Sequence, residues 1–365
     1  MKYLRLLLFP FSLIYGAVIW CRNRLYDLGV LHQTSFDLPV IVVGNLEIGG
    51  TGKSPMIEYL IRLLKVNYKI ATLSRGYGRR TKGFLEAQPG TSAMDLGDEP
   101  LQFKMKFPDI TVAVQENRVA GMEILKKDHD LVLLDDAYQH RALKPGLSIL
   151  LFDYNQLNDI KILFPAGNLR DRISERRRAD IMVVTKCPKD LDHNSKQKIS
   201  RQLEVSGRRI PIFFTGISYS DPIPYNRMIS DGQSQAPETA PPKLEDFQQA
   251  LIVTGIARPA PFEAYVRSGI TRVETLTFPD HHPFSVGDIN LIGKKFEAMN
   301  SERKVILTTE KDKMRLIAKE FADQLMEWPL YYIPIRVEFL GNEGKEFDRQ
   351  ILEYCRKASH SFASQ

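Results

Sequence analysis

The stretch Val40-Ile-Val-Val-Gly-Asn-Leu-Glu-Ile-Gly-Gly-Thr-Gly-Lys-Ser54 runs from an apolar, β-branched segment into a glycine-rich turn. This order predicts a buried strand followed by a loop whose backbone N–H groups surround an anion at the start of the next helix. Lys53 can then reach the β- and γ-phosphates of a nucleotide, and the Ser54 hydroxyl can bind Mg²⁺. The stretch therefore predicts a phosphate-binding loop.

The loop departs from the usual pattern at one position, because Glu47 stands where the first glycine is normally found. Gly49, Gly50 and Gly52 still supply the tight turn, and apolar residues at helical spacing follow at 60–64. The alternative is a glycine-rich loop that binds nothing. It fits less well, because a strand precedes this loop and a helix follows it.

Length, charge and cysteine content set broad limits. The 365-residue chain is long enough for two domains, each with its own core. Its net charge of +6 suits an anionic partner, such as a nucleotide, a phospholipid or a nucleic acid, without choosing among them. Cys21, Cys187 and Cys355 are far apart and lack metal-ligand spacing, which is typical of reduced cysteines in a cytosol-facing protein.

Residues 1–30 form an apolar, basic segment. Lys2 and Arg5 precede an apolar run from Leu6 to Cys21, and Arg22 closes it. As a helix this run is about 24 Å long, which is short for a membrane span. No small-residue cleavage site follows, which argues against a signal peptide. Positive charge on both flanks favours a helix on an anionic bilayer surface; a buried core helix is the alternative.

Apolar, β-rich runs alternate with helical or loop stretches along the first two thirds of the chain. These runs are Val40–Val43, Ile70–Leu73, Leu131–Leu134, Ile149–Phe152, Ile181–Val184 and Ile212–Phe214. The alternation predicts an α/β fold, P-loop NTPase-like, with a mostly parallel sheet covered by helices.

A polar stretch at 220–245, rich in Ser, Asp, Pro and Gln, is typical of a linker. Three further strands are expected beyond it, at Ala250–Val253, Val305–Leu307 and Leu330–Phe339, and they predict a smaller α/β domain. The expected organisation is an amino-terminal helix (1–30), a P-loop domain (31–219), the linker (220–245) and the smaller domain (246–365).

A second nucleotide-site element is Leu131-Val-Leu-Leu-Asp-Asp136, an apolar strand that ends in two carboxylates. Strands of this kind place acidic groups beside the phosphate loop, where Mg²⁺ binds. The roles of Asp135 and Asp136 are not separable from the sequence. The alternative is a buried strand that happens to end in Asp-Asp.

The nucleotide is expected to be ATP. Thr185-Lys-Cys-Pro-Lys-Asp190 resembles a guanine-reading element, but Pro188 occupies the position where Asp is needed. The element is instead expected to supply a strand and a loop near the base. Ile48 stands where partner-activating ATPases carry an extra lysine, which disfavours a dimerising ATPase.

Two further loops carry acid–base chemistry. Gly97-Asp-Glu-Pro100 places adjacent carboxylates ahead of a helix, and Phe278-Pro-Asp-His-His-Pro283 places two histidines on a proline-bounded turn. A kinase needs a group that accepts the proton of the attacking hydroxyl, and Asp98 oriented by His281 would serve. Taken alone, these residues would be ordinary loop acids and a structural turn histidine.

Nine segments in order carry a family resemblance. They are the hydrophobic basic amino terminus, Gly44-Asn45 through Lys53-Ser54-Pro55, Ser74-Arg-Gly-Tyr-Gly78, Gly97-Asp-Glu-Pro100, Asp135-Asp-Ala-Tyr-Gln-His-Arg141, Pro165-Ala-Gly-Asn-Leu-Arg170, Gly255-Ile-Ala-Arg-Pro259, Phe278-Pro-Asp-His281 and Thr309-Glu-Lys-Asp312. Through them the chain resembles the tetraacyldisaccharide 4′-kinase (lipid A 4′-kinase) family along nearly its whole length.

The resemblance implies transfer of the ATP γ-phosphate to the 4′-hydroxyl of a tetraacylated glucosamine disaccharide 1-phosphate. The product would be a lipid A precursor, made at the cytoplasmic face of the inner membrane of a Gram-negative bacterium. No nucleic acid and no obligate protein partner are expected. The rival function is a membrane-associated P-loop switch or assembly ATPase.

The resemblance also assigns roles to site residues. Asp98 is the expected general base, paired with His281, while Arg170 lies on a lid and Lys53 contacts the phosphates. Nucleotide contacts are expected from Asn45, Gly49, Gly50, Thr51, Gly52, Lys53 and Ser54. Magnesium and its water shell are expected at Ser54, Glu99, Asp135 and Asp136, and substrate contacts at Arg75, Tyr77 and Gln139.

Some positions depart from the family pattern or stay open. Ala137 stands where Gly is more frequent, and it removes no catalytic group. Asn168 and Asp171 replace a frequent Pro and Glu, and these two changes affect the expected lid geometry. The Thr309–Asp312 motif has no role that the sequence explains, and helix capping is an equally good interpretation. The arginines of 170–178 fit a solvated face first, phosphate or lipid contact second and nucleic-acid binding last.

Overall fold

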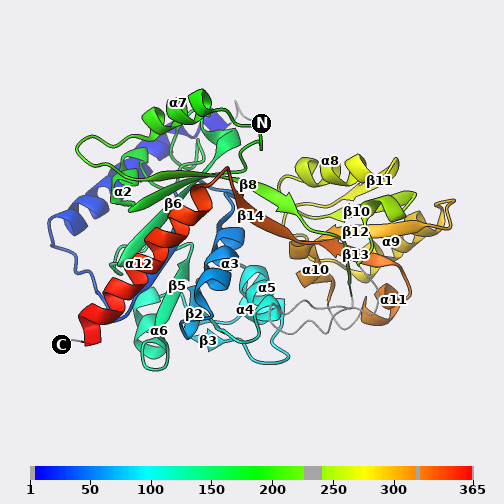
Figure 1. The fold of residues 1–365 in the computed structure, drawn as a ribbon, viewed down its shortest axis with the longest axis horizontal. Helices are drawn as coiled ribbons and strands as arrows, with labels where there is room; N and C mark the ends of the chain where they lie inside the picture. Colours follow the sequence, from blue (N-terminus) through cyan, green and yellow to red (C-terminus); the bar gives the residue numbers. More distant parts are fainter. Residues whose placement is uncertain (1–4, 226–240, 318–320, 364–365) are drawn as a thin grey trace.

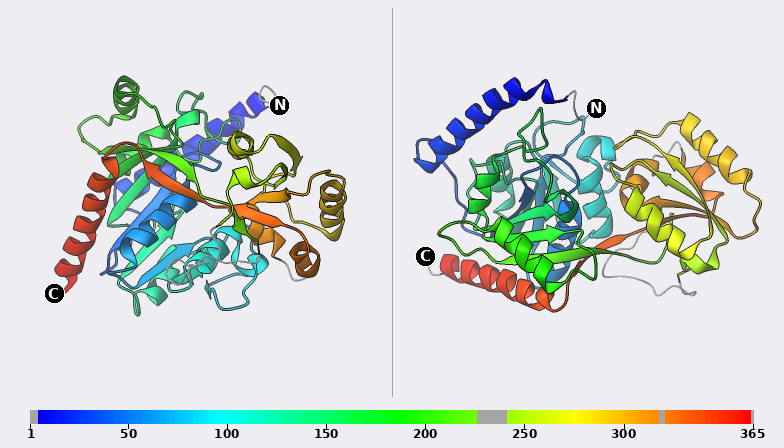
Figure 2. Two further views of the ribbon diagram at one scale, coloured as in Figure 1. Left: turned by 45° about the vertical axis from the view of Figure 1, so that its right-hand side comes forward. Right: turned by 90° about the horizontal axis from the view of Figure 1, so that it is seen from above.

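The computed structural model describes residues 5–225, 241–317 and 321–363. They form a larger and a smaller α/β unit that lie side by side (Figure 1). The amino-terminal helix and the carboxyl-terminal helix both lie on the larger unit (Figure 2). The α/β class expected from the sequence is confirmed.

The larger unit is built on a nine-stranded sheet of order β14-β8-β7-β6-β1-β5-β2-β4-β3. Its strands are β1 (Val40–Asn45), β2 (Ile70–Ser74), β3 (Leu85–Glu86), β4 (Thr111–Val114), β5 (Leu131–Asp135), β6 (Leu147–Asp153), β7 (Ile181–Thr185), β8 (Ile212–Tyr219) and β14 (Ile335–Phe339). All neighbours pair in parallel except β3 with β4 and β14 with β8 at the two edges. The phosphate-loop strand β1 is therefore central, between β5 and β6.

Helices cover both faces of this sheet, so its strands are apolar on both sides. The hydrophobic cluster on one face includes residues of α3 (Lys53–Leu64), α5 (Asp98–Lys106) and α12 (Glu343–Ala363). The cluster on the other face includes residues of α6 (Arg118–Leu125) and α7 (His193–Leu203). The short helix α4 (Ala93–Leu96) precedes α5.

The smaller unit has a five-stranded sheet of order β11-β10-β12-β13-β9. Its strands are β9 (Ile223–Pro224), β10 (Gln249–Thr254), β11 (Arg272–Thr277), β12 (Lys304–Thr309) and β13 (Leu330–Ile333). Its helices are α8 (Ala260–Gly269), α9 (Val286–Glu297), α10 (Glu310–Leu316) and α11 (Ala322–Met326). Two hydrophobic clusters, one with α9 and the other with α8, cover its faces.

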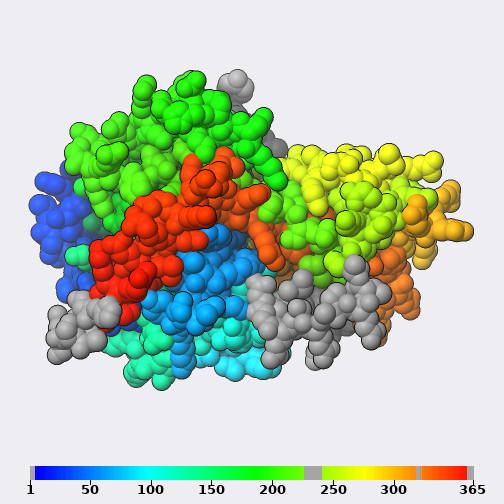
Figure 3. Space-filling model, in the orientation of Figure 1, coloured from blue at the N-terminus to red at the C-terminus, as the bar shows by residue number. Residues whose placement is uncertain are grey.

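The strand expected at Leu330–Phe339 is two strands, and they belong to different sheets. Proline has no N–H to give to a sheet ladder, and Pro334 separates β13 in the smaller sheet from β14 in the larger one. Residues from Ile335 onward therefore lie on the larger unit, although 246–365 was expected to be one domain. The carboxyl-terminal residues accordingly run over the larger unit in the space-filling view (Figure 3).

The amino-terminal helix α2 (Phe9–Asp27) buries two polar side chains and leaves several apolar ones exposed, unlike an ordinary surface helix. Ser12 and Asn23 are buried against the larger unit, whereas Phe11, Ile14 and Val18 are 61–64% exposed. Among the residues described, no helix is long and apolar enough to cross a membrane. The exposed side chains show that α2 is not the buried core helix considered as the alternative.

Candidate active site

The phosphate-binding loop connects the centre of the larger sheet to α3. Gly52, the residue before the first turn of α3, has φ +87°, a conformation that favours glycine. The Lys53 ammonium then lies 3.4 Å from Asn45 Oδ1 and 3.7 Å from Asp136 Oδ1. The lysine is thus held over the loop by groups at the ends of β1 and β5.

The two carboxylates after β5 have different surroundings. Both oxygens of Asp136 bind the Arg170 guanidinium, at 2.7 and 2.8 Å, and Arg170 also donates to Asn45 Oδ1. Asp135 is 2% exposed, and its Oδ1 is buried without a hydrogen-bond partner. The structure therefore separates the two acids that the sequence left equivalent.

The charges around these acids shift their pKa values in opposite directions. Burial alone would raise the pKa of Asp136, but Lys53 and Arg170 outweigh it and hold the pKa at about 2. Burial, followed by the charges of Glu99 and Asp136, raises the pKa of Asp135. Asp136 is consequently neutralised by protein cations, whereas the neighbouring carboxyl is short of positive charge.

The unpartnered oxygen of Asp135 is the feature that fits a cation. Within the described parts of the chain, no group of three or more His, Cys, Asp or Glu side chains is arranged to hold a metal ion. Mg²⁺ at phosphate sites takes one or two protein ligands and fills its remaining positions with phosphate oxygens and water. Asp135 is the last residue of β5 and Ser54 lies in the first turn of α3, which follows the neighbouring strand β1, so the two suit that kind of ligand set.

The acid–histidine pair expected from the sequence lies between the two units. His281 Nδ1 is 3.2 Å from Asp98 Oδ2 in the first turn of α5, although 183 residues separate the two in the chain. Gly97, which precedes α5, has φ +100°, and a Cβ there would lie 3.1 Å from the Tyr77 carbonyl oxygen. This close approach positions the carboxylate at the edge of the larger unit.

Two cations that were not predicted as site residues complete this cluster. Arg315 Nε lies 3.1 Å from Asp98 Oδ2, and Lys311 Nζ lies 3.2 Å from His281 Nε2 and 3.5 Å from Glu99 Oε1. Burial alone would raise the pKa of Asp98, but the hydrogen bond from His281 and the charge of Arg315 lower it. Asp98 is therefore held as a carboxylate.

The Thr309–Asp312 motif is the start of α10. The Thr309 hydroxyl oxygen accepts the Asp312 N–H at 3.0 Å, so the capping interpretation holds. The same helix also carries Lys311 and Arg315 to the acid–histidine pair. A single sequence could show the cap but not the distant partners.

The expected substrate residues lie around these groups. Tyr77 is 81% exposed, and its ring centre lies 5.9 Å from that of His281. Arg75 is also exposed, on the same loop after β2. Gln139 instead donates to the Asn45 carbonyl oxygen at 2.7 Å, which ties the segment after β5 to the phosphate-binding loop.

Two more cations border the phosphate loop on the side of β6 and β7. Lys186 binds Asp153 Oδ2 at 2.9 Å and donates to the Gly50 carbonyl oxygen. Arg258, from the smaller unit, binds the same Asp153 oxygen at 3.0 Å. The sequence marked both only as members of longer motifs. The smaller unit thus contacts the larger one through Arg258 as well as through His281.

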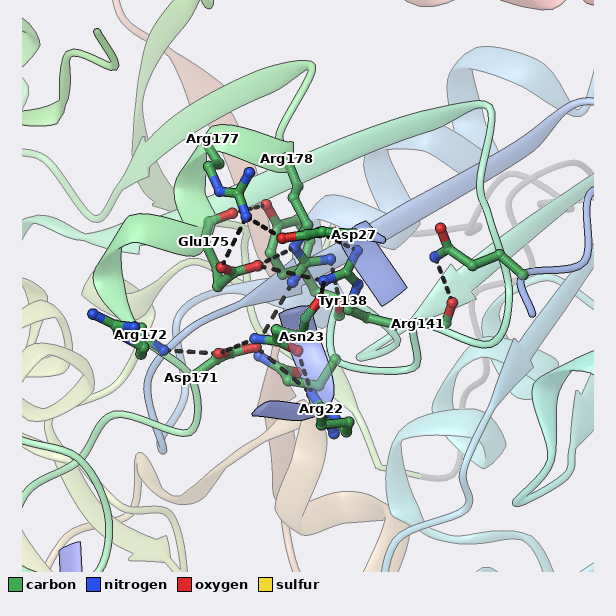
Figure 4. A network of polar contacts seen from close by, with 12 residues as sticks. Arg22, Asn23, Asp27, Tyr138, Arg141, Asp171, Arg172, Glu175, Arg177 and Arg178 are labelled. Atoms are coloured by element: carbon green, nitrogen blue, oxygen red, sulfur yellow. Dashed lines mark hydrogen bonds and ion pairs between the residues drawn. The ribbon is translucent and has the colours of Figure 1, made fainter. Parts of the chain in front are cut away.

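The segment that carries Arg170 is held by α2. Tyr15 donates to the Arg170 carbonyl oxygen at 2.8 Å, and Asn23 donates to Asp171 Oδ1 at 2.9 Å. Figure 4 shows the adjoining network, in which Arg22 of α2, Arg177 and Arg178 form ion pairs with the buried acids Asp171 and Glu175. Much of the expected basic patch is therefore engaged in internal ion pairs.

The arrangement of the candidate site agrees with the family resemblance carried by the sequence motifs. A model of the tetraacyldisaccharide-1-P 4′-kinase (LpxK) family matches residues 4–356. The chain belongs to this kinase family. The resemblance stated from the sequence motifs is confirmed.

Related proteins align with nearly the whole length of the kinase. It is 42% identical to the tetraacyldisaccharide 4′-kinase of Phocaeicola vulgatus over 359 residues, which is 97% of this chain and 96% of that protein. It is 45% identical to the kinase of the same name from Flavobacterium johnsoniae, over 98% and 99% of the two chains. A crystal structure of LpxK from Aquifex aeolicus in complex with ATP superimposes with a TM-score of 0.72 at 29% identity, over 96% and 99% of the chains.

Proposed function

We propose that the kinase transfers the γ-phosphate of ATP to the 4′-hydroxyl of tetraacyldisaccharide 1-phosphate, with Asp98 as general base and His281 as its orienting partner. The observation that carries the proposal is the contact of Asp98 Oδ2 with both His281 and Arg315. The contacts found for Asp98 among the described side chains are all made by Oδ2, which leaves Oδ1 for the acceptor hydroxyl.

The chemical step is a displacement at phosphorus. The 4′-oxygen forms a bond to the γ-phosphorus, the bond to the β,γ-bridging oxygen breaks, and ADP leaves with that electron pair. Asp98 Oδ1 takes the hydroxyl proton, while its lowered pKa keeps it ionised until the hydroxyl arrives. Positioning and charge neutralisation carry most of the catalysis in such a reaction.

Two cations of the larger unit serve the phosphates. Lys53 projects from the start of α3 over the phosphate-binding loop formed by Asn45 and residues 49–54, including Thr51. Arg170 is fixed beside the loop by its bidentate pair with Asp136. From there its guanidinium supplies positive charge to the transferring group.

Mg²⁺ fits the vacant oxygen of Asp135 together with Ser54, with Glu99 in the surrounding shell. When bound there, the ion would offset the negative charge of the phosphates. Asp136 acts through Arg170 and Lys53, because both of its oxygens already bind Arg170. The acceptor sugar would lie against Arg75 and Tyr77 near His281, and would reach Gln139 beside the phosphate-binding loop.

The exposed apolar face of α2 is proposed to seat the enzyme on the anionic cytoplasmic surface of the inner membrane, where its lipid substrate resides. A variant with Phe11, Ile14 and Val18 changed to Gln should lose flotation with anionic vesicles. It retains the polar contacts of Ser12 and Asn23 with the larger unit, so its melting curve should stay near that of the wild type. Unchanged flotation would refute this seating.

The decisive experiment is a transfer assay with γ-labelled ATP, Mg²⁺ and tetraacyldisaccharide 1-phosphate in detergent micelles. Label at the sugar 4′ position is the expected result. Label found only as free phosphate would refute the proposal. That result, with stimulation by a protein partner, would favour the switch ATPase instead. No nucleic acid and no protein partner are needed in the assay.

A further inference from the structure

Lys311 is the one side chain of the Thr309–Asp312 motif that reaches the acid–histidine pair. Its Nζ lies 3.2 Å from His281 Nε2, and the opposite ring nitrogen, Nδ1, lies 3.2 Å from Asp98 Oδ2. The imidazole is therefore held between a cation on one side and a carboxylate on the other. The contact comes from α10, while the histidine belongs to the turn that follows β11.

Hydrogen-bond chemistry allows only one neutral form of the ring in this arrangement. A lysine ammonium has three donors and no acceptor, so Nε2 must offer a lone pair to Lys311. The single ring proton then resides on Nδ1 and is donated to Asp98 Oδ2. The opposite tautomer would direct an N–H at the ammonium and a lone pair at the carboxylate, losing both hydrogen bonds.

We propose that Lys311 is a positioning residue that keeps His281 in the Nδ1–H form, so that the imidazole donates to Asp98. This inference rests on the proposed function in that it gives Lys311 a part in the same reaction. It also concerns a property of the folded chain, the location of one proton, that is measurable without substrate.

The neighbours of Lys311 hold it in place. The adjoining Glu310 is 8% exposed and points away from the pair, into a buried contact with Lys106 of α5 at 2.8 Å. Lys106 also binds Glu58 of α3 at 2.7 Å. This buried cluster fastens α10 to the helix that carries Asp98 and to the helix of the phosphate loop.

The remaining groups that face His281 do not compete for the same nitrogen. Tyr77 contacts the ring with its own ring, at 5.9 Å between centres. Arg315 is directed to Asp98 Oδ2 and to Asp312 Oδ1. Lys311 itself also forms an ion pair with Glu99, with 3.5 Å between Nζ and Oε1.

The test is a ¹⁵N spectrum of the full chain labelled at its seven histidines, with His281 assigned by the loss of its signals in His281→Gln. The expected wild-type result is a protonated, pyrrole-type Nδ1 and an unprotonated, pyridine-type Nε2. Finding the proton on Nε2 in the wild type would overturn the proposal without any variant. This measurement stands even if the wild type were to show no lipid phosphorylation, so the two proposals fail separately.

Variants of Lys311 add a kinetic test. Lys311→Met should abolish the fixed Nδ1–H signal and lower kcat by about 10- to 100-fold, with the KM for ATP within about twofold of wild type. Lys311→Arg, which still donates, should restore the signal and most of kcat. Lys357→Met, at a side chain 75% exposed on α12, is the matched control and should change neither.

Two outcomes of this series would overturn the proposal. One is a Lys311→Met protein with wild-type kcat and an unchanged His281 spectrum. The other is a Lys311→Met protein with low kcat but an unchanged spectrum, because the lysine would then act through its charge alone. A melting curve for each variant separates either result from loss of the fold.

Discussion

Arg170 binds both carboxylate oxygens of Asp136, through Nη1–Oδ2 and Nη2–Oδ1 distances of 2.8 and 2.7 Å. The planar guanidinium fork matches a carboxylate in this way, and a lysine ammonium cannot. Because Lys53 is 3.7 Å from the same carboxylate, the acid also connects Arg170 to the phosphate loop. The position of the Arg170 guanidinium therefore depends on its fork geometry as well as on its charge.

Arg170→Lys is expected to lower kcat by at least about 100-fold, since the positive charge remains but its fixed position is lost. The measurement is label transfer to the lipid at saturating ATP. Arg172→Lys, at an exposed neighbour, should stay near wild type. A nearly normal rate for Arg170→Lys would show that the fork geometry is dispensable.

Asp98→Asn is expected to lower kcat by about 10²- to 10⁴-fold with little change in ATP affinity, because an amide cannot take the hydroxyl proton. Asp288→Asn is a matched control: Asp288 accepts from the adjacent His282 at 3.1 Å, outside the proposed site. Rates and ATP titrations of both variants check this. An equal loss of kcat in Asp98→Asn and Asp288→Asn would indicate that breaking an Asp–His contact acts through the structure and not through proton transfer.

Lys106→Met should destabilise the protein by about 3–5 kcal/mol, because it leaves the buried carboxylates Glu58 and Glu310 without their shared cation. Denaturant unfolding gives this free energy directly. Lys189→Met, at a side chain 75% exposed, should cost less than about 1 kcal/mol. A loss that small for Lys106→Met would mean that water reaches the cluster.

His140 should make stability depend on pH. Burial, followed by Arg118, Arg22 and Arg75, lowers the pKa of His140 to about 4, against about 6.5 unfolded. The neutral ring thus contributes stability that is present above pH 6.5 and is lost as the pH falls towards 4. Allowing for its partial exposure, His140→Gln should reduce this loss by about 1–2 kcal/mol. Parallel curves of unfolding free energy against pH for the wild type and His140→Gln would contradict the prediction.

Much of the larger sheet was predictable because its strands are buried on both faces. Runs such as Val40–Val43 and Leu131–Leu134 are apolar without interruption, and the structure extends each by only one or two residues. In the smaller sheet, the edge strand β11 (Arg272–Thr277) was not predicted, because its exposed residues leave no apolar run in the sequence. Leu330–Phe339 was predicted as one strand, because hydrophobicity does not tell which sheet a strand joins.

The candidate site, like the fold, was predictable from the sequence only in part. Local patterns give the phosphate-binding loop and the carboxylates after β5, because each belongs to one strand and the turn that follows it. Lys311 and Arg315 could not be assigned, since their acidic partners, Glu99 and Asp98, are more than 200 residues away and on the other unit. The difference in surroundings between Asp135 and Asp136 could not be predicted either, because it depends on Arg170, which comes from a separate segment of the chain.

The pairing of β8 with β14 has a consequence for how the chain is assembled. Tyr219 and Ile335 are direct neighbours in that antiparallel pair, so the residues between them leave and re-enter the larger sheet at one place. The smaller unit is in effect an insertion in the tip of a β-hairpin. A chain in which a short turn replaces residues 220–334 should therefore still fold, with the circular dichroism of an α/β protein, while losing phosphoryl transfer because His281 is gone.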